Sequence, residues 1–414
     1  MRTSDIDVVV VGAGAAGLAA SRALIEAGHT AMMFEARDRI GGRAWTDSDT
    51  FGVPIDRGCS FLHSADINPL TDIAKRLGFS VIARNPDWGG SSARHILSPL
   101  EITDCDHAFD WFFDQLKEHR NCEPDVPISS IFPKHWRWEA VVRAVVTFWC
   151  GVDADQISLC DVANFRDTEQ NWSVKEGYGT VIAKLGEDIP VRLNAPVNGI
   201  DWSGNDVRVS VNDTVLRAKA VVITVPTTLL ADETIKFTPA LPVDKQEACQ
   251  YLPLGINNKV FIAVDGNPFG AEPGTHILSS VSSTRISSIH LLHKGHPLVD
   301  AYLGGDYARE LEQAGNEIAT QIVTDELVQV FGGDVRQRLG KSVTTGWLAD
   351  PWSRGAYSYA VPGHAARRTD LAAPIADRLF FAGEATSVEF YATANGAYLS
   401  GQRAASEVTA VLSR

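Results

Sequence analysis

The N-terminal segment alternates between short apolar runs and an amphipathic stretch. Asp7 to Val11 ends in four consecutive valines, which is typical of a parallel strand buried on both faces. Residues 15–27 carry apolar side chains at helical spacing, and Gly28 stands where a helix commonly ends in the left-handed conformation. Thr30 to Phe34 is a second apolar run. A strand, a helix and a strand within about 30 residues predict a βαβ unit with parallel strands.

Further along the chain the pattern changes. Residues 70–186 hold longer amphipathic and aromatic-rich stretches, which predict a mostly helical region. Residues 192–216 alternate apolar and polar side chains around Gly204-Asn205-Asp206, which predicts a β-hairpin. We expect further strands at residues 218–225, 260–264, 290–292 and 378–382, and helices at residues 316–331 and 396–412.

Strands of the nucleotide-binding type thus occur at the start, the middle and the end of the 414 residues. We therefore predict an α/β fold with a discontinuous, Rossmann-like dinucleotide-binding domain formed by residues 1–75, 187–237 and 365–414. Residues 76–186 and 238–364 are predicted to form an inserted α+β substrate-binding domain, in which helices cover a sheet. Two domains also suit the length of the chain.

Composition narrows the class of protein. The net charge of -14 argues against partners such as nucleic acid or an anionic membrane. It would favour a cationic substrate, although solubility alone is the more common reason for such a charge. The six cysteines form no C-x-x-C pair, so we predict no disulfide framework, no metal site and a reducing, cytoplasmic location. No signal-like leader or membrane-spanning run of about 18 apolar residues is seen.

The turn after the first strand carries candidate chemistry. Residues 12–17 read G-A-G-A-A-G and fit the pattern G-x-G-x-x-G. Gly12 permits the tight turn, Gly14 lets the backbone approach a pyrophosphate, and Gly17 lets the helix pack closely on the strand. The amides of Ala15 and Ala16 stand at the helix N-terminus, which attracts an anion.

Glu35 ends the second strand, eighteen positions after Gly17 (35 minus 17). An acid at this place accepts hydrogen bonds from an adenosine ribose and disfavours the 2'-phosphate of NADP. A glycine-rich turn without a ligand is the alternative. The combination of strand, helix, second strand and acid favours a dinucleotide site.

Residues 35–43 read E-A-R-D-R-I-G-G-R and resemble the E-A-x-x-x-x-G-G-R signature of the flavin amine oxidases, the monoamine oxidase and polyamine oxidase family. The resemblance implies FAD as the cofactor. It also implies that Arg43 contacts the pyrophosphate, that Arg37 lies near the adenosine, and that Ala36 and Gly42 line the same site. A guanidinium suits this role because it contacts phosphate through two N–H groups.

Other segments resemble the same family. Residues 58–63 (G-C-S-F-L-H) resemble G-A-S-W-I-H of polyamine oxidases, residues 380–384 (F-F-A-G-E) are a family segment, and residues 391–401 resemble Y-P-A-T-V-H-G-A-x-x-S-G. By this resemblance the other cofactor contacts are Gly58, Ser60, Val197, Trp347, Gly383, Glu384, Thr393, Ala394 and Ala397.

The resemblance also implies which residues lie near the flavin ring and the amine substrate. Lys259, in residues 252–260 (L-P-L-G-I-N-N-K-V), corresponds to a lysine that holds a water against flavin N5; otherwise it is a strand-edge lysine in water. In residues 350–359, Tyr357 corresponds to one wall of an aromatic cage for the amine. Trp352 corresponds to an aromatic near the flavin, with core packing as its alternative.

Two departures from the family pattern carry predictions. Ala356 stands where monoamine oxidases have the cysteine that bonds the flavin, so we expect noncovalent FAD. Thr393 stands where they have the second cage tyrosine, so we expect half of the cage to be missing. His63 matches a histidine that faces the active site in many polyamine oxidases, and a purely structural hydrogen-bonding role stays open for it.

The function predicted from these features is the oxidation of an amine to an imine. Hydrolysis then gives an aldehyde or ketone, and molecular oxygen is reduced to hydrogen peroxide. An aliphatic di- or polyamine is slightly favoured as the small-molecule substrate, and a homodimer is left open. An L-amino-acid oxidase, which would need an arginine clamp that the sequence does not locate, another amine dehydrogenase, and a non-catalytic FAD-bound subunit are the alternatives. A chromatin-type demethylase would usually carry a long coiled-coil insertion, which the sequence does not suggest.

Overall fold

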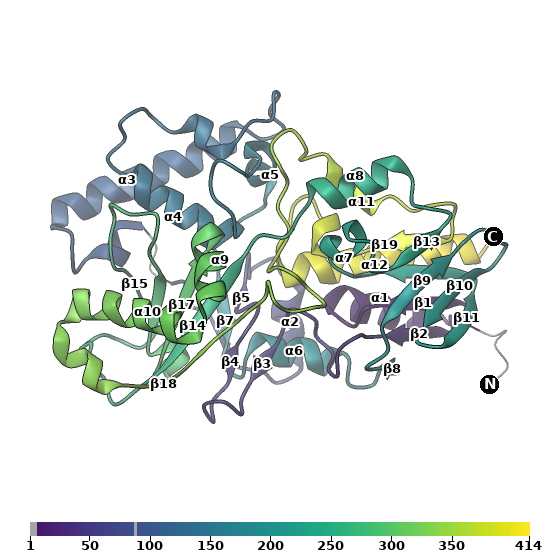
Figure 1. Ribbon diagram of the computed structural model, residues 1–414, viewed down its shortest axis with the longest axis horizontal. Helices are drawn as coiled ribbons and strands as arrows, with labels where there is room; N and C mark the ends of the chain where they lie inside the picture. The colour runs from purple at the N-terminus through teal and green to yellow at the C-terminus, as the bar shows by residue number, and fades with distance from the viewer. Residues whose placement is uncertain (1–5, 87–88) are drawn as a thin grey trace.

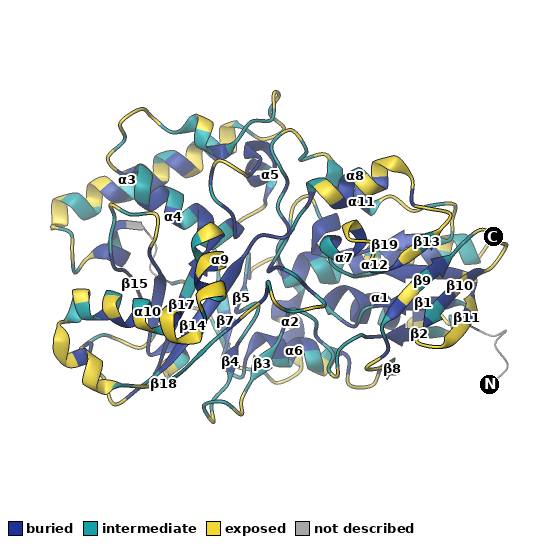
Figure 2. Ribbon diagram, in the orientation of Figure 1, coloured by how far each residue is buried: buried dark blue, intermediate teal, exposed yellow. Residues whose placement is uncertain are grey.

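A computed structural model describes residues 6–86 and 89–414 of the chain. The molecule has two lobes, which lie side by side along its longest axis (Figure 1). One lobe is built around a parallel sheet and the other around an antiparallel sheet. Figure 2 shows that the strands of both sheets are mostly buried, with the exposed residues on the outer faces of the helices and loops.

The parallel sheet has the strand order β19-β12-β1-β2-β8. Its strands are β19 (Leu379–Phe381), β12 (Ala220–Ile223), β1 (Val8–Val11), β2 (Ala31–Phe34) and β8 (Val191–Arg192). Helices α1 (Ala15–Glu26) and α12 (Ala394–Leu412) pack against each other beside it. Val8 and Val10 enter one core and Val9 and Val11 another, so β1 is buried on both faces. The predicted βαβ unit is confirmed.

A second, four-stranded sheet lies next to the parallel one. Its order is β11 (Thr214–Ala218), β10 (Val207–Val211), β9 (Val197–Asp201) and β13 (Lys236–Thr238). β9 and β10 are the predicted hairpin, with antiparallel pairing. The predicted hairpin is confirmed, and the structure adds two strands to it: β11 extends the hairpin and β13 joins from a distant part of the chain. Helices α7 (Thr227–Ala231), α8 (Val243–Tyr251) and α11 (Arg367–Ala372) belong to this lobe.

The other lobe contains an antiparallel sheet and two helical layers. The sheet order is β15 (Thr275–Leu278), β16 (Ser288–Leu291), β17 (Leu298–Gly304), β14 (Asn257–Val264) and β18 (Leu339–Thr344). Helices α9 (Gly305–Ala314) and α10 (Asn316–Phe331) share a core with one face of this sheet. Helices α3 (Pro99–Glu118), α4 (Glu139–Cys150) and α5 (Leu159–Asn164) form the second layer. The predicted helix at residues 316–331 is confirmed with both of its ends.

Residues 70–186 are less uniformly helical than predicted. Strand β7 (Trp172–Val174) pairs with both β6 (Val81–Ile82) and β5 (Phe61–Leu62), and β3 (Thr46–Asp47) pairs with β4 (Ile55–Asp56). Short paired segments of this kind leave no periodic signal. Helices α2 (Pro69–Arg76) and α6 (Tyr178–Leu185) complete the region.

The limits predicted for the two domains stay predictions. The core contacts add a refinement, because residues of α6 share a core with β1 and α1, and residues of α8 share a core with the opposite face of β1. Both helices thus pack with the parallel sheet. Within residues 6–86 and 89–414, none of the helices is both long and apolar enough to cross a membrane.

Candidate active site

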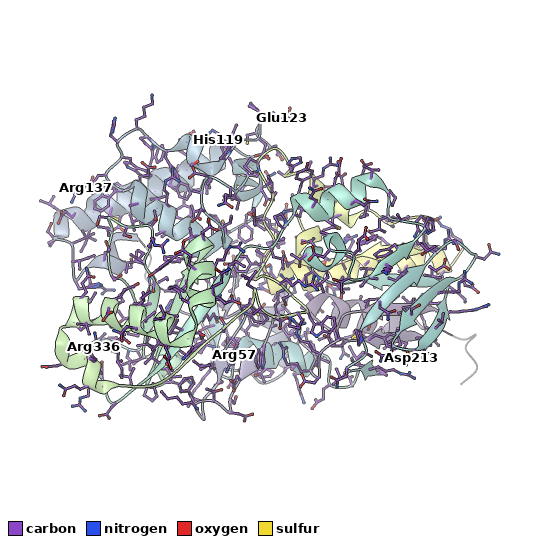
Figure 3. The ribbon with its side chains drawn as sticks, viewed as in Figure 1. Arg57, His119, Glu123, Arg137, Asp213 and Arg336 are labelled. Atoms are coloured by element: carbon purple, nitrogen blue, oxygen red, sulfur yellow. The ribbon has the colours of Figure 1, made fainter. Side chains whose placement is uncertain are left out.

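A cavity of about 950 Å³ lies between the lobes and is lined by residues of both. This volume is near the upper end of the usual range of about 300–1,000 Å³ for ligand pockets. Arg57, which lines the cavity, lies where the two lobes meet (Figure 3). The cavity is therefore large enough for a cofactor together with a substrate.

The glycine-rich turn forms one end of the cavity. Gly12 has a φ of +101°, and Gly17 approaches the strand so closely that a Cβ there would lie 1.9 Å from the Gly12 carbonyl oxygen. Gly17 does not line the cavity; it brings α1 against β1, as predicted. Gly14 precedes α1 and gives it no side-chain cap, while Ala15 and Ala16 line the cavity. The first amides of α1 are thus available to an anion.

Glu35 lies beside this turn, with 5% of its surface exposed. Its carboxylate accepts hydrogen bonds from the backbone N–H of Ala13 (2.8 Å) and of Arg37 (2.9 Å). Both Glu35 and Arg37 line the cavity. The Arg37 guanidinium donates hydrogen bonds to Asp350 Oδ1 (2.5 Å) and Ser353 Oγ (2.7 Å). These bonds link the predicted dinucleotide site to residues 350–359.

Arg43 also lines the cavity. Its Nη1 donates to the Ala356 carbonyl (2.7 Å) and to Glu384 Oε1 (3.0 Å). In the described part of the chain only this nitrogen is engaged, so the rest of the guanidinium can receive a phosphate. An uncapped helix end, an acid for the ribose and a partly free guanidinium together fit FAD.

Glu384, in the short helical segment Glu384–Thr386, connects Arg43 to further hydrogen bonds behind the cavity wall. It accepts hydrogen bonds from Ser358 Oγ (2.6 Å) and from the Ala392 N–H (2.8 Å). Burial opposes its charge, but Arg43 and Ser358 outweigh burial and hold the pKa of Glu384 below its usual value.

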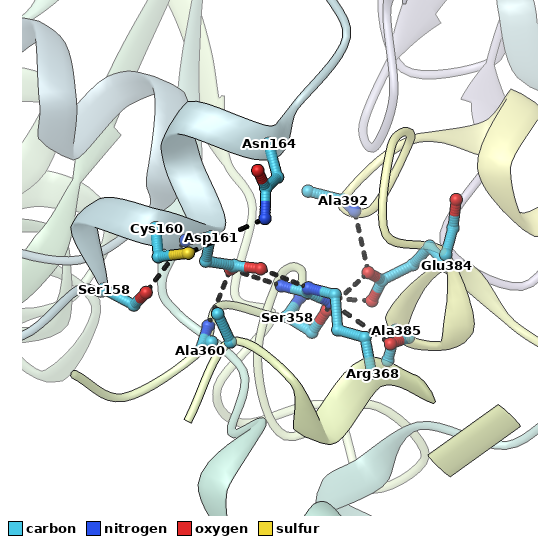
Figure 4. Close-up of polar contacts among 12 residues, drawn as sticks. Ser158, Cys160, Asp161, Asn164, Ser358, Ala360, Arg368, Glu384, Ala385 and Ala392 are labelled. Carbon is cyan, nitrogen blue, oxygen red and sulfur yellow. Dashed lines mark hydrogen bonds and ion pairs between the residues drawn. The ribbon is translucent and has the colours of Figure 1, made fainter. Parts of the chain in front are cut away.

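A fully buried arginine extends the network, which Figure 4 shows in close-up. Arg368 donates to both oxygens of Asp161 (2.6 and 2.7 Å) and to Ser358 Oγ (2.9 Å). Asp161 comes from α5 and Arg368 from α11. This bidentate pair therefore joins the helical layer of one lobe to the other lobe, directly behind Glu384.

Lys259 lies inside β14 rather than at its start, and 3% of its surface is exposed. Its ammonium donates to the carbonyls of Asp56 (2.6 Å) and Gly58 (2.7 Å) and to Ser60 Oγ. Burial lowers its pKa. The side chain lines the cavity, and its predicted role of holding a water at the flavin stays a prediction.

Aromatic side chains also line the cavity. The Tyr357 hydroxyl donates to the Phe148 carbonyl (2.9 Å). Tyr391 also lines the cavity, with the Phe165 ring edge-on at 5.3 Å. Of these two tyrosines only Tyr357 was predicted from the sequence, although Tyr391 stands two residues before Thr393. The hydroxyl of Thr393 caps α12 by accepting from the Gly396 N–H (3.0 Å).

The other predicted residues lie around the same cavity. His63 Nδ1 is 2.6 Å from Asn171 Oδ1, and Trp347 Nε1 donates to the Arg57 carbonyl (3.1 Å). Trp352 lines the wall as well. Apart from Gly17, every predicted site residue is brought to this cavity, including Ala36, Gly42, Gly58, Ser60, Val197, Gly383, Ala394 and Ala397.

Two groups of lining residues were not predicted from the sequence. One is a set of acidic side chains, Asp106, Asp110, Asp114, Asp167 and Glu169; the other is Ser288, His290 and Tyr302. The signals available were the four-residue spacing of the aspartates on a predicted helix and the alternation of polar and apolar residues in the strands.

Comparison with known proteins extends the resemblance. Residues 15–89 and 129–409 match the family model for flavin containing amine oxidoreductases. The chain is 32% identical to a probable polyamine oxidase 4 of Arabidopsis thaliana, over 95% of this chain and 85% of that protein. It is 30% identical to the human lysine-specific histone demethylase 2, over 97% of this chain but only 53% of that protein, so it spans about half the length of that relative.

Solved structures share the fold. Cyclohexylamine oxidase from Brevibacterium oxydans IH-35A has a TM-score of 0.80 at 21% identity and covers 99% of this chain and 100% of its own. A putrescine oxidase variant has a TM-score of 0.79 at 20% identity, with 99% of both chains covered. The predicted two-domain amine oxidase architecture is thereby confirmed, as is the expectation of a flavin cofactor. The chain belongs to the flavin-containing amine oxidoreductases, a family that includes polyamine oxidases.

Proposed function

We propose that this enzyme oxidises an aliphatic di- or polyamine and uses molecular oxygen as the electron acceptor. For a primary amine, the amine, oxygen and water give an aldehyde, ammonia and hydrogen peroxide. Bound FAD, attached noncovalently, supplies the hydride acceptor. The chain itself binds the amine, orients its reacting carbon and excludes water.

The observation that carries the substrate class is the distribution of charge in the cavity. Asp106, Asp110 and Asp114 line it from α3, and their four-residue spacing puts them on one face of that helix. Asp167 and Glu169 line the cavity from the segment after α5. These five carboxylates in the cavity lining favour a substrate with more than one positive charge.

Two cationic side chains, Lys117 and Arg120, also line the cavity and reduce the negative potential of these carboxylates. Lys117 is paired with Asp114 (3.0 Å), and Arg120 donates through Nε to the Ala163 carbonyl (3.2 Å). An L-amino-acid oxidase would need a cation for the substrate carboxylate. Arg120 is the candidate for that role, and an amino-acid substrate therefore belongs in the test.

The aromatic residues support the position of the reacting amine. Tyr357 and Tyr391 line the cavity, and an aromatic face attracts an ammonium group. The hydroxyl of Tyr357 is fixed by the Phe148 carbonyl, so this ring is held in place before the substrate binds. A distal nitrogen of a long amine would then extend toward the carboxylates of α3.

The test compares initial rates of peroxide formation with spermine, spermidine, putrescine, benzylamine, tyramine and several L-amino acids. We expect Asp110→Asn/Asp114→Asn to lower kcat/KM for spermidine about tenfold, or about 1.4 kcal/mol, and to leave benzylamine nearly unchanged. Asp213→Asn is the control, because Asp213 lies at the far end of the other lobe (Figure 3). Equal losses for both amines would reject the role of the carboxylates. A higher kcat/KM for benzylamine or for an amino acid would reject the substrate class.

The attachment of the cofactor is tested separately. Ala356 has no group that can bond the flavin, and its carbonyl accepts from Arg43. We expect acid precipitation of the yellow protein to release intact FAD into the supernatant. Flavin that stays in the pellet would reject noncovalent binding.

A further inference from the structure

The two faces of the antiparallel sheet of β15, β16, β17, β14 and β18 differ in character. The face toward α9 and α10 is apolar and includes Val260, Ile289 and Val299. On the other face the strand register sets polar side chains opposite one another. His276 pairs with His290, His290 with Asp300, and in the next row Ser288 with Tyr302 and Tyr302 with Lys259. Directly paired residues of neighbouring strands project on the same side of a sheet.

This polar face is buried. His276, Ser288, His290 and Lys259 are each at most 3% exposed, and Asp300 is 0% exposed. A buried polar row on a sheet is expected to form a complete hydrogen-bonded network. Asp300 departs from that expectation.

Neither carboxylate oxygen of Asp300 has a hydrogen-bond partner among residues 6–86 and 89–414. His293 Nε2 lies 3.7 Å from Asp300 Oδ2, too far for a hydrogen bond, and that nitrogen likewise has no hydrogen-bond partner within this part of the chain. The same holds for the Tyr302 hydroxyl. Burial without a hydrogen-bond donor disfavours the charged carboxylate, so Asp300 takes up a proton more readily than a carboxylate in water does.

The other ionisable groups that face Asp300 leave it as the group free to change its charge. Lys294 and Asp56 form an ion pair at 2.5 Å, in which both side chains are at most 1% exposed. Lys259 donates all three ammonium hydrogens to protein oxygens, which favours its charged form. Burial lowers the pKa of both His290 and His293 well below the usual value, which favours their neutral forms.

The pKa of Asp300 lies close to neutral pH. Burial raises its pKa to about 6, and the charges of Lys259 and Lys294 limit the increase. A small change in nearby charge therefore decides whether Asp300 carries a proton at neutral pH.

The polar face is next to the cavity. His290, Tyr302 and Lys259 line it, and His290 is the strand partner of Asp300. A negative charge that appears in the cavity acts on Asp300 across these side chains with little water to screen it.

We propose that Asp300 is a proton-holding residue of the enzyme: its carboxylate would take up one proton from solvent when reduction of bound FAD places negative charge in the cavity, and would return that proton to solvent on reoxidation. The proton forms an O–H bond on the carboxylate, and no electron passes to Asp300. This proposal rests on the binding of FAD and not on the identity of the amine.

The test is the pH dependence of the midpoint potential of bound FAD. The wild-type potential should fall more steeply with pH above about pH 6, because two-electron reduction there takes up one additional proton. Asp300→Asn should lack this steeper region, match the wild type below about pH 6 and have the higher potential above it. Asp265→Asn, which removes an exposed carboxylate, is the control and should follow the wild type.

A second measurement uses the wild type alone, in case the variant folds poorly. The infrared difference spectrum of protein with labelled aspartate should gain a protonated carboxylic acid band on reduction and lose it on reoxidation. An Asp300→Asn curve parallel to that of the wild type, or the absence of an aspartate band, overturns the proposal. If the redox-linked signal is present but no amine is oxidised, the proposed substrate class fails and this proposal stands.

Discussion

Two of the buried aspartates have opposite surroundings. Asp161 accepts two hydrogen bonds from Arg368 and one from the Ala360 N–H (3.0 Å), whereas Asp300 has none within the described residues. A carboxylate with a full set of donors keeps its charge and fixes the geometry around it. One without donors is free to exchange a proton. The Asp161–Arg368 pair is therefore a rigid joint between the lobes, whereas Asp300 is a titratable group beside the cavity.

The largest expected effect comes from breaking the joint. Arg368→Met leaves the Asp161 charge buried and unpaired. We therefore expect the free energy of unfolding, measured in urea, to fall by about 3–5 kcal/mol. Arg336→Met is the control, because the Arg336–Asp325 pair has side chains 46% and 56% exposed; its loss should be below about 1 kcal/mol. Equal losses for the two variants would contradict the rigid-joint interpretation.

A paired variant sharpens this test. Asp161→Leu/Arg368→Met removes both charges, so it should recover much of the stability lost by Arg368→Met alone. A double variant as unstable as the sum of the single ones would show that packing, and not the buried charge, dominates.

The next effect is the pH dependence of stability at Asp300. Its folded-state pKa, about 6, lies above the usual 3.8. The contribution of Asp300 to the free energy of unfolding is thus complete below about pH 4. It is lost as pH rises through about 6, which lowers the free energy of unfolding by about 3 kcal/mol. Asp300→Asn should lack this loss, so the difference between variant and wild type should grow from pH 4 to pH 8. A constant difference in unfolding free energy would refute the raised pKa.

A smaller effect is expected at Lys259. Lys259→Met should keep FAD but slow the reaction of the reduced enzyme with oxygen about tenfold, or about 1.4 kcal/mol. A buried positive charge favours the negative charge that oxygen acquires. Rapid mixing of the reduced protein with oxygen measures this rate, with the exposed Lys184→Met as the control. Unchanged reoxidation would reject the assignment.

The dinucleotide end could be predicted from the sequence because its signals are local. Gly12, Gly17 and Glu35 lie within one βαβ unit, where turn, helix and strand constrain one another. The same applies to α10, whose ends are set by Gly315 and Gly332, both with positive φ.

The joint and the polar sheet face depend on contacts between distant residues. Asp161 and Arg368 are 207 positions apart, and no local pattern pairs them. In β17 the alternation of Asp300 and Tyr302 with apolar neighbours is typical of a strand with one face in water. Only the packing of the lobes shows that this face is buried.

Tyr391 belongs to both the joint and the cavity wall. Its ring lies 3.8 Å from the Arg368 guanidinium carbon while it lines the cavity. An engineer who enlarges the cavity at this position would therefore loosen the protein at the same time. Phe113 lines the cavity from the exposed side of α3 and is 36% exposed, so it is the better first position for a library that seeks new amine substrates.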